Sequence, residues 1–381
     1  MTYSSTVPRD PEDRQALLRR VEDAGRDLRR GRMVVLYGEK TRFAVLAAEC
    51  ITGDAFAALR RRGDDNTLVA MTSNRAAVLR ISPTGNNTVI VSMPDHFNSR
   101  LIRSLADPTQ DLSNPVRGPF VPETEAPSPV LDAAIRLCKL VHLLPMVVVA
   151  EIDGPMDGVL EIRTDDVWAF DETAAISLQR VSSARVPLQG AEDSRLIAFR
   201  PMDGGVEHLA IVIGDPSRET PVLARLHSEC FTGDLLESLK CDCGQQLRGA
   251  IEEISAAGGG VLLYLAQEGR GIGLINKLRA YHLQDEGFDT IEANERLGFD
   301  PDERLFLPAA EMLRNLGFTQ IRLMTNNPDK VETLSRLGID VVERVPHEFP
   351  SNAHNELYLA TKAKRSGHYL SAGKKSAGRK P

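Results

Sequence analysis

Residues 261–287 of the 381-residue chain read VLLYLAQEGRGIGLINKLRAYHLQDEG, and they set the pattern of its second half. The apolar run 261–266 is typical of a buried strand, the glycines after it predict a tight turn, and 274–287 has the spacing of a helix. The same signals recur on both sides of this stretch. We expect strands at 208–214, 222–228, 321–326 and 341–346, and helices at 233–240, 244–258, 308–317 and 327–338.

The first half alternates in the same way, with less regular spacing. Its expected strands are 33–38, 67–73 and 145–152, its expected helices are 14–30, 55–62 and 131–143, and a proline-rich loop covers 115–129. A chain of this length normally forms more than one domain. We predict the fold class α/β (α+β) with two domains, the second built on a mixed sheet, and a boundary between about residues 185 and 205.

Composition excludes several classes of protein. The net charge of -7 gives no reason to expect nucleic acid or an anionic membrane as a partner. No apolar run is long enough to span a bilayer, and residues 1–20 contain no apolar signal segment. We therefore expect a cytoplasmic protein that has neither a membrane nor a nucleic acid as partner.

The five cysteines do not form a disulfide framework, because their number is odd and their spacing is uneven. Cys50 and Cys138 stand singly in apolar surroundings, where a small buried side chain is expected. Cys230, Cys241 and Cys243 cluster with the spacing C-x10-C-x-C, which differs from the paired knuckles of structural zinc sites. Clustering of this kind indicates a metal site.

Three thiolates leave one position of a tetrahedral zinc ion open, as in catalytic zinc sites, where the metal lowers the pKa of a bound water toward ~7. Glu229 and Asp242 could orient that water or the ligands. Two alternatives stay open on spacing alone: three unrelated cysteines, or a structural site completed by His227.

Glu268, Gly269 and Arg270 lie in the glycine-rich turn between the strand 261–266 and the next helix. Backbone N–H groups in such a turn can approach an anion closely. A carboxylate there could accept from guanine N1 and N2, and an arginine could bind a phosphate. A simple turn with two solvated charges is the alternative.

Other polar residues are ambiguous when each is taken alone. Asp302 and Arg304 could form an ion pair, which the spacing favours, or act as a general base and an anion clamp. Thr325 and Lys330 flank a helix start, where a hydroxyl and an ammonium could meet phosphate. Tyr281 could place a phenol in a site, although packing in the core is favoured.

Taken together, four long segments closely resemble the GTP cyclohydrolase II family, over about residues 205–370. They are RLHSECFTGDLLESLKCDCGQQL (225–247), YLAQEGRGIGLINKLRAYHLQDEGFDTIEAN (264–294), LGFDPDER (297–304) and TNNPDKVETLSRLGIDVVERVP (325–346). The resemblance implies zinc-dependent opening of the imidazole ring of GTP in the first step of riboflavin biosynthesis. The implied products are formate, pyrophosphate and 2,5-diamino-6-ribosylamino-4(3H)-pyrimidinone 5′-phosphate.

The same resemblance implies roles for individual residues. One zinc ion per subunit would be bound by Cys230, Cys241 and Cys243. GTP, with magnesium on its triphosphate, would contact Arg225, Leu226, His227, Ser228, Glu229, Gln246, Glu268, Gly269, Arg270, Thr290, Thr325 and Lys330. Asp302 would accept a proton, Arg304 would act at the α-phosphate, and Tyr281 would position the water or the ring-opened intermediate. A homodimer is usual in such families. One departure is Ala266, where the family commonly has an arginine, and this puts the affinity for GTP in doubt.

The first half resembles a degenerate 3,4-dihydroxy-2-butanone 4-phosphate synthase. The segment GRMVVLYGEKTRFAVLAAECITGDAFAAL (31–59) follows the frame of that family, but YGEKTRFAVL (37–46) replaces its acidic signature. SPVLDAAIRL (128–137) stands where a Gly-His-Thr-Glu motif is usual. Because magnesium and a sugar phosphate need those carboxylates, we expect no synthase reaction.

These observations divide the chain into four expected ranges. Residues 1–12 form a flexible terminus, 13–204 the degenerate synthase-like domain, 205–370 the cyclohydrolase domain, and 371–381 a disordered basic tail.

Two other functions remain as alternatives. One is a bifunctional enzyme that also has synthase activity, and the other is a GTP-binding regulator without catalysis.

Overall fold

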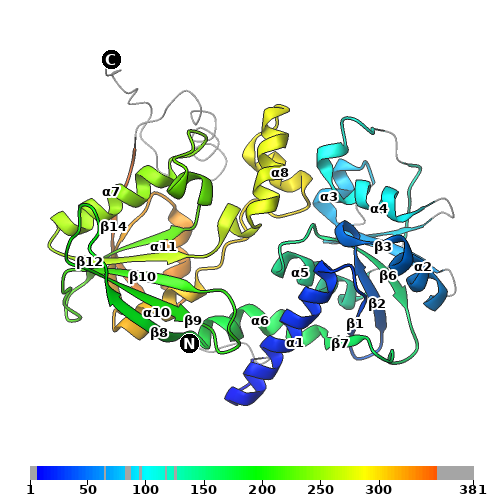
Figure 1. Cartoon of the computed structure of the whole chain (residues 1–381), viewed down its shortest axis with the longest axis horizontal. Helices are drawn as coiled ribbons and strands as arrows, with labels where there is room; N and C mark the ends of the chain where they lie inside the picture. Colours follow the sequence, from blue (N-terminus) through cyan, green and yellow to red (C-terminus); the bar gives the residue numbers. More distant parts are fainter. Residues whose placement is uncertain are drawn as a thin grey trace. The chain divides into compact units, whose positions relative to one another are not determined.

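The computed structural model describes residues 7–63, 66–81, 87–93, 97–115, 118–123 and 127–349. These residues form two compact units, each assembled from two separate stretches of chain (Figure 1). Of the described residues, the N-terminal unit takes 7–173 and 272–303, and the C-terminal unit takes 174–271 and 304–349. The units therefore differ from the ranges 13–204 and 205–370 expected from the sequence. The expected tail 371–381 lies outside the described residues.

The N-terminal unit is built on sheet A, whose strands follow the order β5-β4-β3-β6-β2-β1-β7. Neighbouring strands are antiparallel except for β1 and β7, which are parallel. The strands are β1 (Val34–Tyr37), β2 (Arg42–Ala47), β3 (Thr67–Thr72), β4 (Thr88–Ser92), β5 (Val121–Pro122), β6 (Met146–Glu151) and β7 (Leu160–Arg163).

Several helices of this unit begin where a polar side chain caps them. Asp10 accepts from the Glu12 N–H at the start of α1, so the helix begins inside the terminus that was expected to be flexible. Thr52, Asn98 and Ser128 cap three others in the same way. The helices are α1 (Pro11–Arg29), α2 (Gly53–Arg62), α3 (Ser73–Val78), α4 (Ser99–Ala106), α5 (Pro129–Leu140), α6 (Thr164–Ile176), α8 (Leu274–Asp285) and α9 (Thr290–Arg296).

The C-terminal unit is built on sheet B, in the order β14-β13-β11-β12-β10-β9-β8. Strands β14, β13, β11 and β12 are parallel neighbours, and the pairs from β12 to β8 are antiparallel. The strands are β8 (Gln179–Arg185), β9 (Ser194–Arg200), β10 (His208–Ile213), β11 (Val222–Ser228), β12 (Gly260–Leu265), β13 (Gln320–Met324) and β14 (Asp340–Val345). A mixed sheet confirms the predicted fold class.

Helices cover both faces of sheet B. Ile251 and Ile254 of α7 (Cys243–Ala256) pack on one face with Leu262 of β12. On the other face, α10 (Leu307–Leu316) and α11 (Pro328–Arg336) share a core with Leu263. Asn327 caps α11 ahead of Pro328, as the sequence predicts. Among the described residues, no helix is long and apolar enough to cross a membrane.

The helix expected at 233–240 is absent, and that prediction is wrong. A single π turn, Phe231–Leu235, is followed by irregular chain in which Glu237 has a φ of 53°. Leu235 and Leu239 are largely exposed (67% and 59%), so this stretch has no buried apolar face. The local chain is held instead by Asp234, whose carboxylate accepts from the backbone N–H of Cys230.

Candidate metal and nucleotide site

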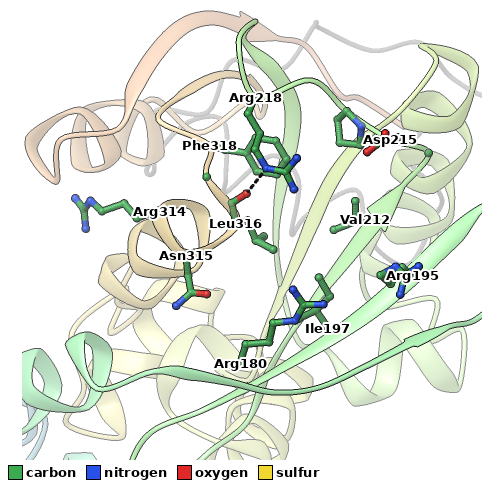
Figure 2. Close-up of a pocket in the computed structure, with 13 residues that line it drawn as sticks. Arg180, Arg195, Ile197, Val212, Asp215, Arg218, Arg314, Asn315, Leu316 and Phe318 are labelled. Atoms are coloured by element: carbon green, nitrogen blue, oxygen red, sulfur yellow. Dashed lines mark hydrogen bonds between the residues drawn. The ribbon is translucent and has the colours of Figure 1, made fainter.

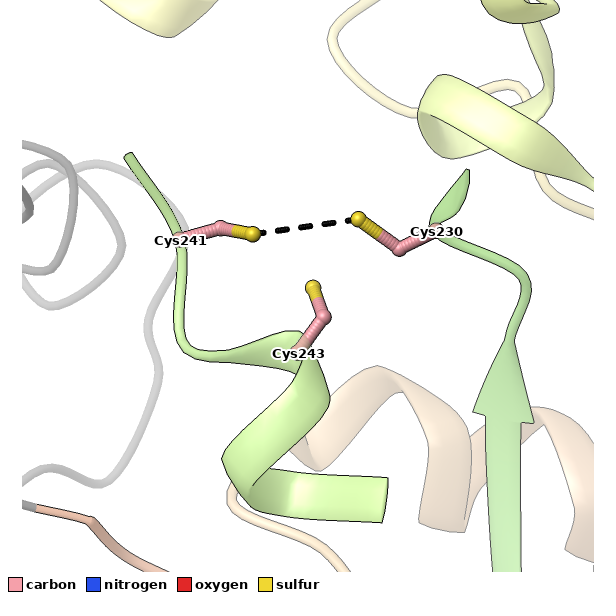
Figure 3. A group of neighbouring side chains, drawn as sticks. All are labelled: Cys230, Cys241 and Cys243. Carbon is pink, nitrogen blue, oxygen red and sulfur yellow. Dashed lines mark hydrogen bonds between the residues drawn. The ribbon is translucent and has the colours of Figure 1, made fainter. Parts of the chain in front are cut away.

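The structure brings the three clustered thiols together at the end of β11 (Figure 3). Cys230 follows the strand, Cys243 begins α7, and Cys241 lies just before it. All three Sγ atoms are within 4.8 Å of one another, and those of Cys230 and Cys241 are 3.8 Å apart. A tetrahedron with metal–sulfur bonds of about 2.3 Å has edges of about 3.8 Å. The thiol spacing therefore fits a zinc ion.

Gly233, in the π turn, leaves the space beside these sulfurs open. A Cβ atom at this position would lie 2.7 Å from Cys241 Sγ and 3.0 Å from Cys230 Sγ. Both distances are shorter than side-chain atoms tolerate without a shift of the neighbours. The sequence Thr-Gly-Asp after Cys230 thus needs its glycine for a close approach to the thiols.

The thiols influence one another strongly. The hydrogen bond with Cys230, together with burial, raises the pKa of the Cys241 thiol to about 11. Hydrogen bonds with Cys230 and Cys241 likewise raise the pKa of Cys243 well above its usual value. Three thiolates this close together would repel each other unless a cation lay between them. The cluster therefore suits a doubly charged metal ion.

Asp234 is the centre of a buried polar network beside the thiols. Its carboxylate accepts from the Cys230 backbone N–H, the Tyr264 hydroxyl and His227 Nε2, each at 3.0 Å. The His227 ring stacks on Tyr264, with centroids 5.5 Å apart. Burial lowers the pKa of His227, which is therefore neutral near pH 7 and donates from Nε2. Sequence reasoning missed Asp234, although it lies only four residues after Cys230.

Glu268 supports the same turn through backbone hydrogen bonds. It is 9% exposed, and its carboxylate accepts from the backbone N–H of Phe231 at 2.6 Å and of Gly269 at 2.9 Å. Gly269 and Arg270 both have positive φ (65° and 60°), so the tight turn predicted after β12 is present. A left-handed conformation is uncommon for an arginine and marks a backbone held in place by its surroundings.

Arg225 lies buried under the site. Its Nη1 donates to the Met324 carbonyl at 2.8 Å, and its Nη2 to Gln246 Oε1 at 2.5 Å, while Gln246 Nε2 donates to Asp242 Oδ2. Burial lowers the pKa of Arg225 to about 10. Within the described residues its Nε atom has no hydrogen-bond partner, and a buried donor of this kind is suited to a bound anion.

Lys330 and Thr325 are also buried, with exposed fractions of 6% and 2%. Lys330 Nζ donates to the Leu226 carbonyl at 2.9 Å and lies 5.4 Å from the centroid of the Phe306 ring. Arg304 approaches the same ring, with Cζ 5.6 Å from its centroid. Thr325 Oγ1 accepts from the Asn327 N–H at 3.0 Å, at the start of α11.

Two further predicted residues lie at the carboxyl end of β11: Ser228 is its last residue, and Glu229 follows it. Ser228 Oγ accepts from Gln267 Nε2 at 2.9 Å, and the backbone N–H of Glu229 donates to the Leu265 carbonyl at 2.8 Å. Most predicted residues of this unit thus lie on β11 or just after the carboxyl ends of β11, β12 and β13, where ligands bind in open sheets of parallel strands, whereas Gln246 and Lys330 lie on α7 and α11. We call this region the carboxyl end of sheet B.

Three predicted residues belong to the N-terminal unit. Tyr281 lies on α8, where Lys277 Nζ is 5.6 Å from the centroid of its ring. Thr290 is the first residue of α9, and its hydroxyl accepts from Gln284 Nε2 at 3.3 Å. Asp302 is exposed in the segment that follows α9. The ion pair favoured between Asp302 and Arg304 stays a prediction.

The two single cysteines lie in the N-terminal unit. Cys138 is fully buried, as expected for a small apolar side chain, and burial raises the pKa of its thiol. Cys50 is only partly buried, and burial again raises its pKa. Neither thiol has the low pKa of a reactive cysteine.

A cavity of about 430 Å³ lies at the opposite, amino end of sheet B (Figure 2). Arg218 precedes β11 and Phe318 precedes β13, whereas Arg180 and Arg195 come from β8 and β9. These arginines are exposed, and Arg218 Nε donates to the Leu316 carbonyl at 3.2 Å. None of the predicted site residues lines this cavity.

Comparison with known proteins gives a consistent picture. The family model described as GTP cyclohydrolase II matches residues 179–346. The GTP cyclohydrolase-2 of Azospirillum brasilense is 49% identical over 364 residues, 93% of this chain and 94% of that protein. The riboflavin biosynthesis protein RibBA of Chlorobium phaeovibrioides is 36% identical over 92% of this chain and 96% of its own length. The GTP cyclohydrolase-2 of Shigella boydii is 53% identical over 51% of this chain and 99% of its own length.

Among solved structures, a two-domain 3,4-dihydroxy-2-butanone 4-phosphate synthase from A. baumannii covers 86% of this chain and 99% of that one. The sequence identity is 17% and the TM-score is 0.29.

Proposed function

The chain belongs to the GTP cyclohydrolase II family, and from this premise we propose that it hydrolyses GTP at the carboxyl end of sheet B in riboflavin biosynthesis. The observation that carries the proposal is the thiol cluster, which lies among buried cationic and carboxylate side chains at the ends of parallel strands. The relative from Azospirillum brasilense, which aligns with nearly the whole chain, carries the name of this activity.

Zinc is the metal that we propose for the three thiols. Cys230, Cys241 and Cys243 would be its ligands, because soft thiolates at a 3.8 Å spacing suit tetrahedral zinc and Gly233 keeps the space beside them clear. When bound, zinc supplies a Lewis acid that lowers the pKa of water to about 7. One ion per chain follows, because the described part of the chain contains one such cluster.

Side chains of the C-terminal unit would bind the two ends of GTP. We propose that the Glu268 carboxylate, which is held by the backbone N–H groups of Phe231 and Gly269, accepts from the N1 and N2 donors of guanine. Buried Arg225 and Lys330, with Arg270, supply the positive charge that a triphosphate carrying magnesium requires. The other proposed contacts in this unit come from Leu226, His227, Ser228, Glu229, Gln246, Gly269 and Thr325.

The remaining roles follow the resemblance in sequence. Asp302 would accept a proton, Tyr281 would position the reacting groups, and Arg304 would act at the α-phosphate, while Thr290 would contact GTP. The proposed products are formate, pyrophosphate and 2,5-diamino-6-ribosylamino-4(3H)-pyrimidinone 5′-phosphate.

The direct test is turnover of GTP by the purified, zinc-loaded chain with magnesium. We expect formate, pyrophosphate and a product whose mass matches the deformylated pyrimidinone. If neither formate nor pyrophosphate is formed while GTP still binds, the enzyme proposal fails and a GTP-binding regulator becomes the better account.

A second activity has one observation in its favour, the 36% identity with a RibBA protein over most of the chain. Against it, Glu39 is the only carboxylate in the frame 37–46, and binding of magnesium with a sugar phosphate normally uses several. We propose that the first half lacks synthase activity. Incubation with ribulose 5-phosphate should yield no formate, and formate formation at an enzymatic rate would establish the second activity.

A further inference from the structure

The first half of the chain binds a segment that carries part of the proposed site. This segment, Ile272–Glu303, contains Tyr281, Thr290 and Asp302, and it belongs to the same compact unit as residues 7–173. The sequence alone places the segment in the cyclohydrolase half, so its contacts with the first half need a reason.

Apolar packing joins the segment to sheet A. The buried residues that α8, α9 and their flanks contribute are Ile272, Ala280, Leu283, Ala293, Leu297 and Phe299. They share one continuous core with Met71, Leu105 and Leu144 of the first half. Burial of this kind fixes both helices against a rigid sheet.

Polar contacts then fix the orientation of α8. Arg279 Nη2 lies 2.7 Å from Glu49 Oε1, and its Nε lies 3.5 Å from Asp107 Oδ2. Asn276, which is fully buried, donates from Nδ2 to the His142 carbonyl at 2.9 Å. Tyr281 lies on the same helix, two residues after Arg279.

The end of α9 is held by a second group of contacts. Arg75 is 1% exposed, and its Nη1 donates to the Arg296 carbonyl at 3.3 Å. The neighbouring Asn74 donates from Nδ2 to the Phe299 carbonyl at 3.0 Å. Both donors come from α3, so the chain that leads from α9 toward Asp302 is tied to the first half.

Lys139 of α5 completes the attachment. Its Nζ lies 2.9 Å from Asp300 Oδ2 and 2.6 Å from Glu303 Oε1, the carboxylates on either side of Asp302. Glu303 Oε1 also accepts from the Asp300 N–H at 2.9 Å, which closes the loop. The Lys139 and Glu303 side chains are only 13% and 11% exposed, so water screens this pair less than an ordinary surface ion pair.

We propose that the first half of the chain is a positioning scaffold for the cyclohydrolase reaction, with Lys139 as the positioning residue for the loop around Asp302. The inference rests on the proposed function, because it takes Tyr281, Thr290 and Asp302 as residues of that reaction. It gives the first half a role that needs no synthase chemistry.

The test is turnover of GTP by the full chain carrying Lys139→Gln. The glutamine keeps much of the length of the side chain but removes the charge that holds both carboxylates. We expect kcat to fall about tenfold with KM unchanged, since a small misplacement of a reacting group costs catalysis more than binding. Lys139→Arg keeps the cation and should retain most of the activity. Zinc content should stay at the wild-type level in both variants.

A matched control is Arg20→Gln, which removes another ion pair of the same unit, 3.0 Å from Asp166, without touching the segment. This variant should keep wild-type kcat. If Lys139→Gln does not fold, the same kinetic measurement on Glu49→Gln tests the proposal. This variant weakens the ion pair with Arg279, so its kcat should also fall.

The outcomes separate this inference from the proposed function. Absence of GTP turnover in the wild-type chain would refute the proposed function. If the wild-type chain turns over GTP and Lys139→Gln has the same kcat, the scaffold proposal is wrong and the proposed function stands. Loss of zinc from Lys139→Gln, or an equal loss of kcat in Arg20→Gln, would also overturn it, because either result indicates a general loss of structure.

Discussion

The two ends of sheet B differ in how their polar side chains are held. At the carboxyl end, Glu268 and Arg225 are buried and the Asp234 side chain is only 7% exposed, and each makes at least two hydrogen bonds. At the amino end, a cavity of about 430 Å³ is bordered by exposed arginines. The cavity therefore lies at the amino end of sheet B, whereas the polar groups that are held in place lie at its carboxyl end.

This difference shows where catalysis can be expected. Groups that stabilise a developing charge must be held in place before the reaction, which requires packing and hydrogen bonds around them. The charges of exposed arginines are screened by salt. We therefore assign chemistry to the carboxyl end of sheet B, and the variants below test that assignment.

The largest effect is expected for Cys241→Ser. A hydroxyl is a poor ligand for zinc beside two thiolates, so bound metal and formate release should both fall to background. Metal analysis and a formate assay on the same sample check this. Cys50→Ser, in the N-terminal unit, is the control and should keep both. Full activity of Cys241→Ser would refute the metal assignment.

Gly233→Ala should have the second largest effect. The added Cβ would lie 2.7 Å from Cys241 Sγ, so the thiols must move apart. We expect zinc affinity to fall about tenfold or more, as for other changes beside a metal site. Competition with a zinc chelator measures it. Gly154→Ala is the matched control, because no atom lies within 4 Å of a Cβ there. Equal affinities in the two variants would contradict the close approach.

Asp234→Asn should have an intermediate effect. An amide nitrogen cannot accept from His227, Cys230 or Tyr264 as the carboxylate oxygens do, so the turn that carries Cys230 loosens. A loss of zinc affinity of about tenfold is expected. Tyr264→Phe removes one of these bonds and should cost less. A larger loss in Tyr264→Phe than in Asp234→Asn would show that Asp234 is not the centre of the network.

Arg195→Gln should have the smallest effect. Arg195 borders the cavity at the amino end of sheet B and is exposed. We expect kcat and KM for GTP to change by less than about twofold, as for most exposed positions outside a site. Steady-state kinetics would reveal a larger change, and such a change would move part of the chemistry to the amino end.

Much of this fold follows from local sequence signals. The apolar runs of β10 to β13 and the Asn-Pro start of α11 predict elements that the structure contains. Strand β8 was not predicted because it is an exposed strand at the border of the sheet, and its sequence QRVSSAR contributes no buried residue. Residues 233–240 mislead because their leucines have helical spacing but remain exposed.

The candidate site was predictable in part. The spacing of the cysteines predicts a thiol cluster, and the structure forms it. The network around Asp234 was not predictable, because its partners Cys230, His227 and Tyr264 are four, seven and thirty residues away in the chain. The sequence also could not predict that residues 272–303 pack on the first half. This packing depends on contacts between residues that are more than 100 positions apart in the chain, such as Asn276 with His142 and Arg279 with Glu49.

The most direct test of the account is a zinc titration of the chelator-treated, full-length chain, with bound metal and formate release from GTP measured in each sample. The account predicts that formate release rises in proportion to bound zinc and reaches its maximum at one ion per chain. Full formate release from protein that contains no bound metal would contradict it.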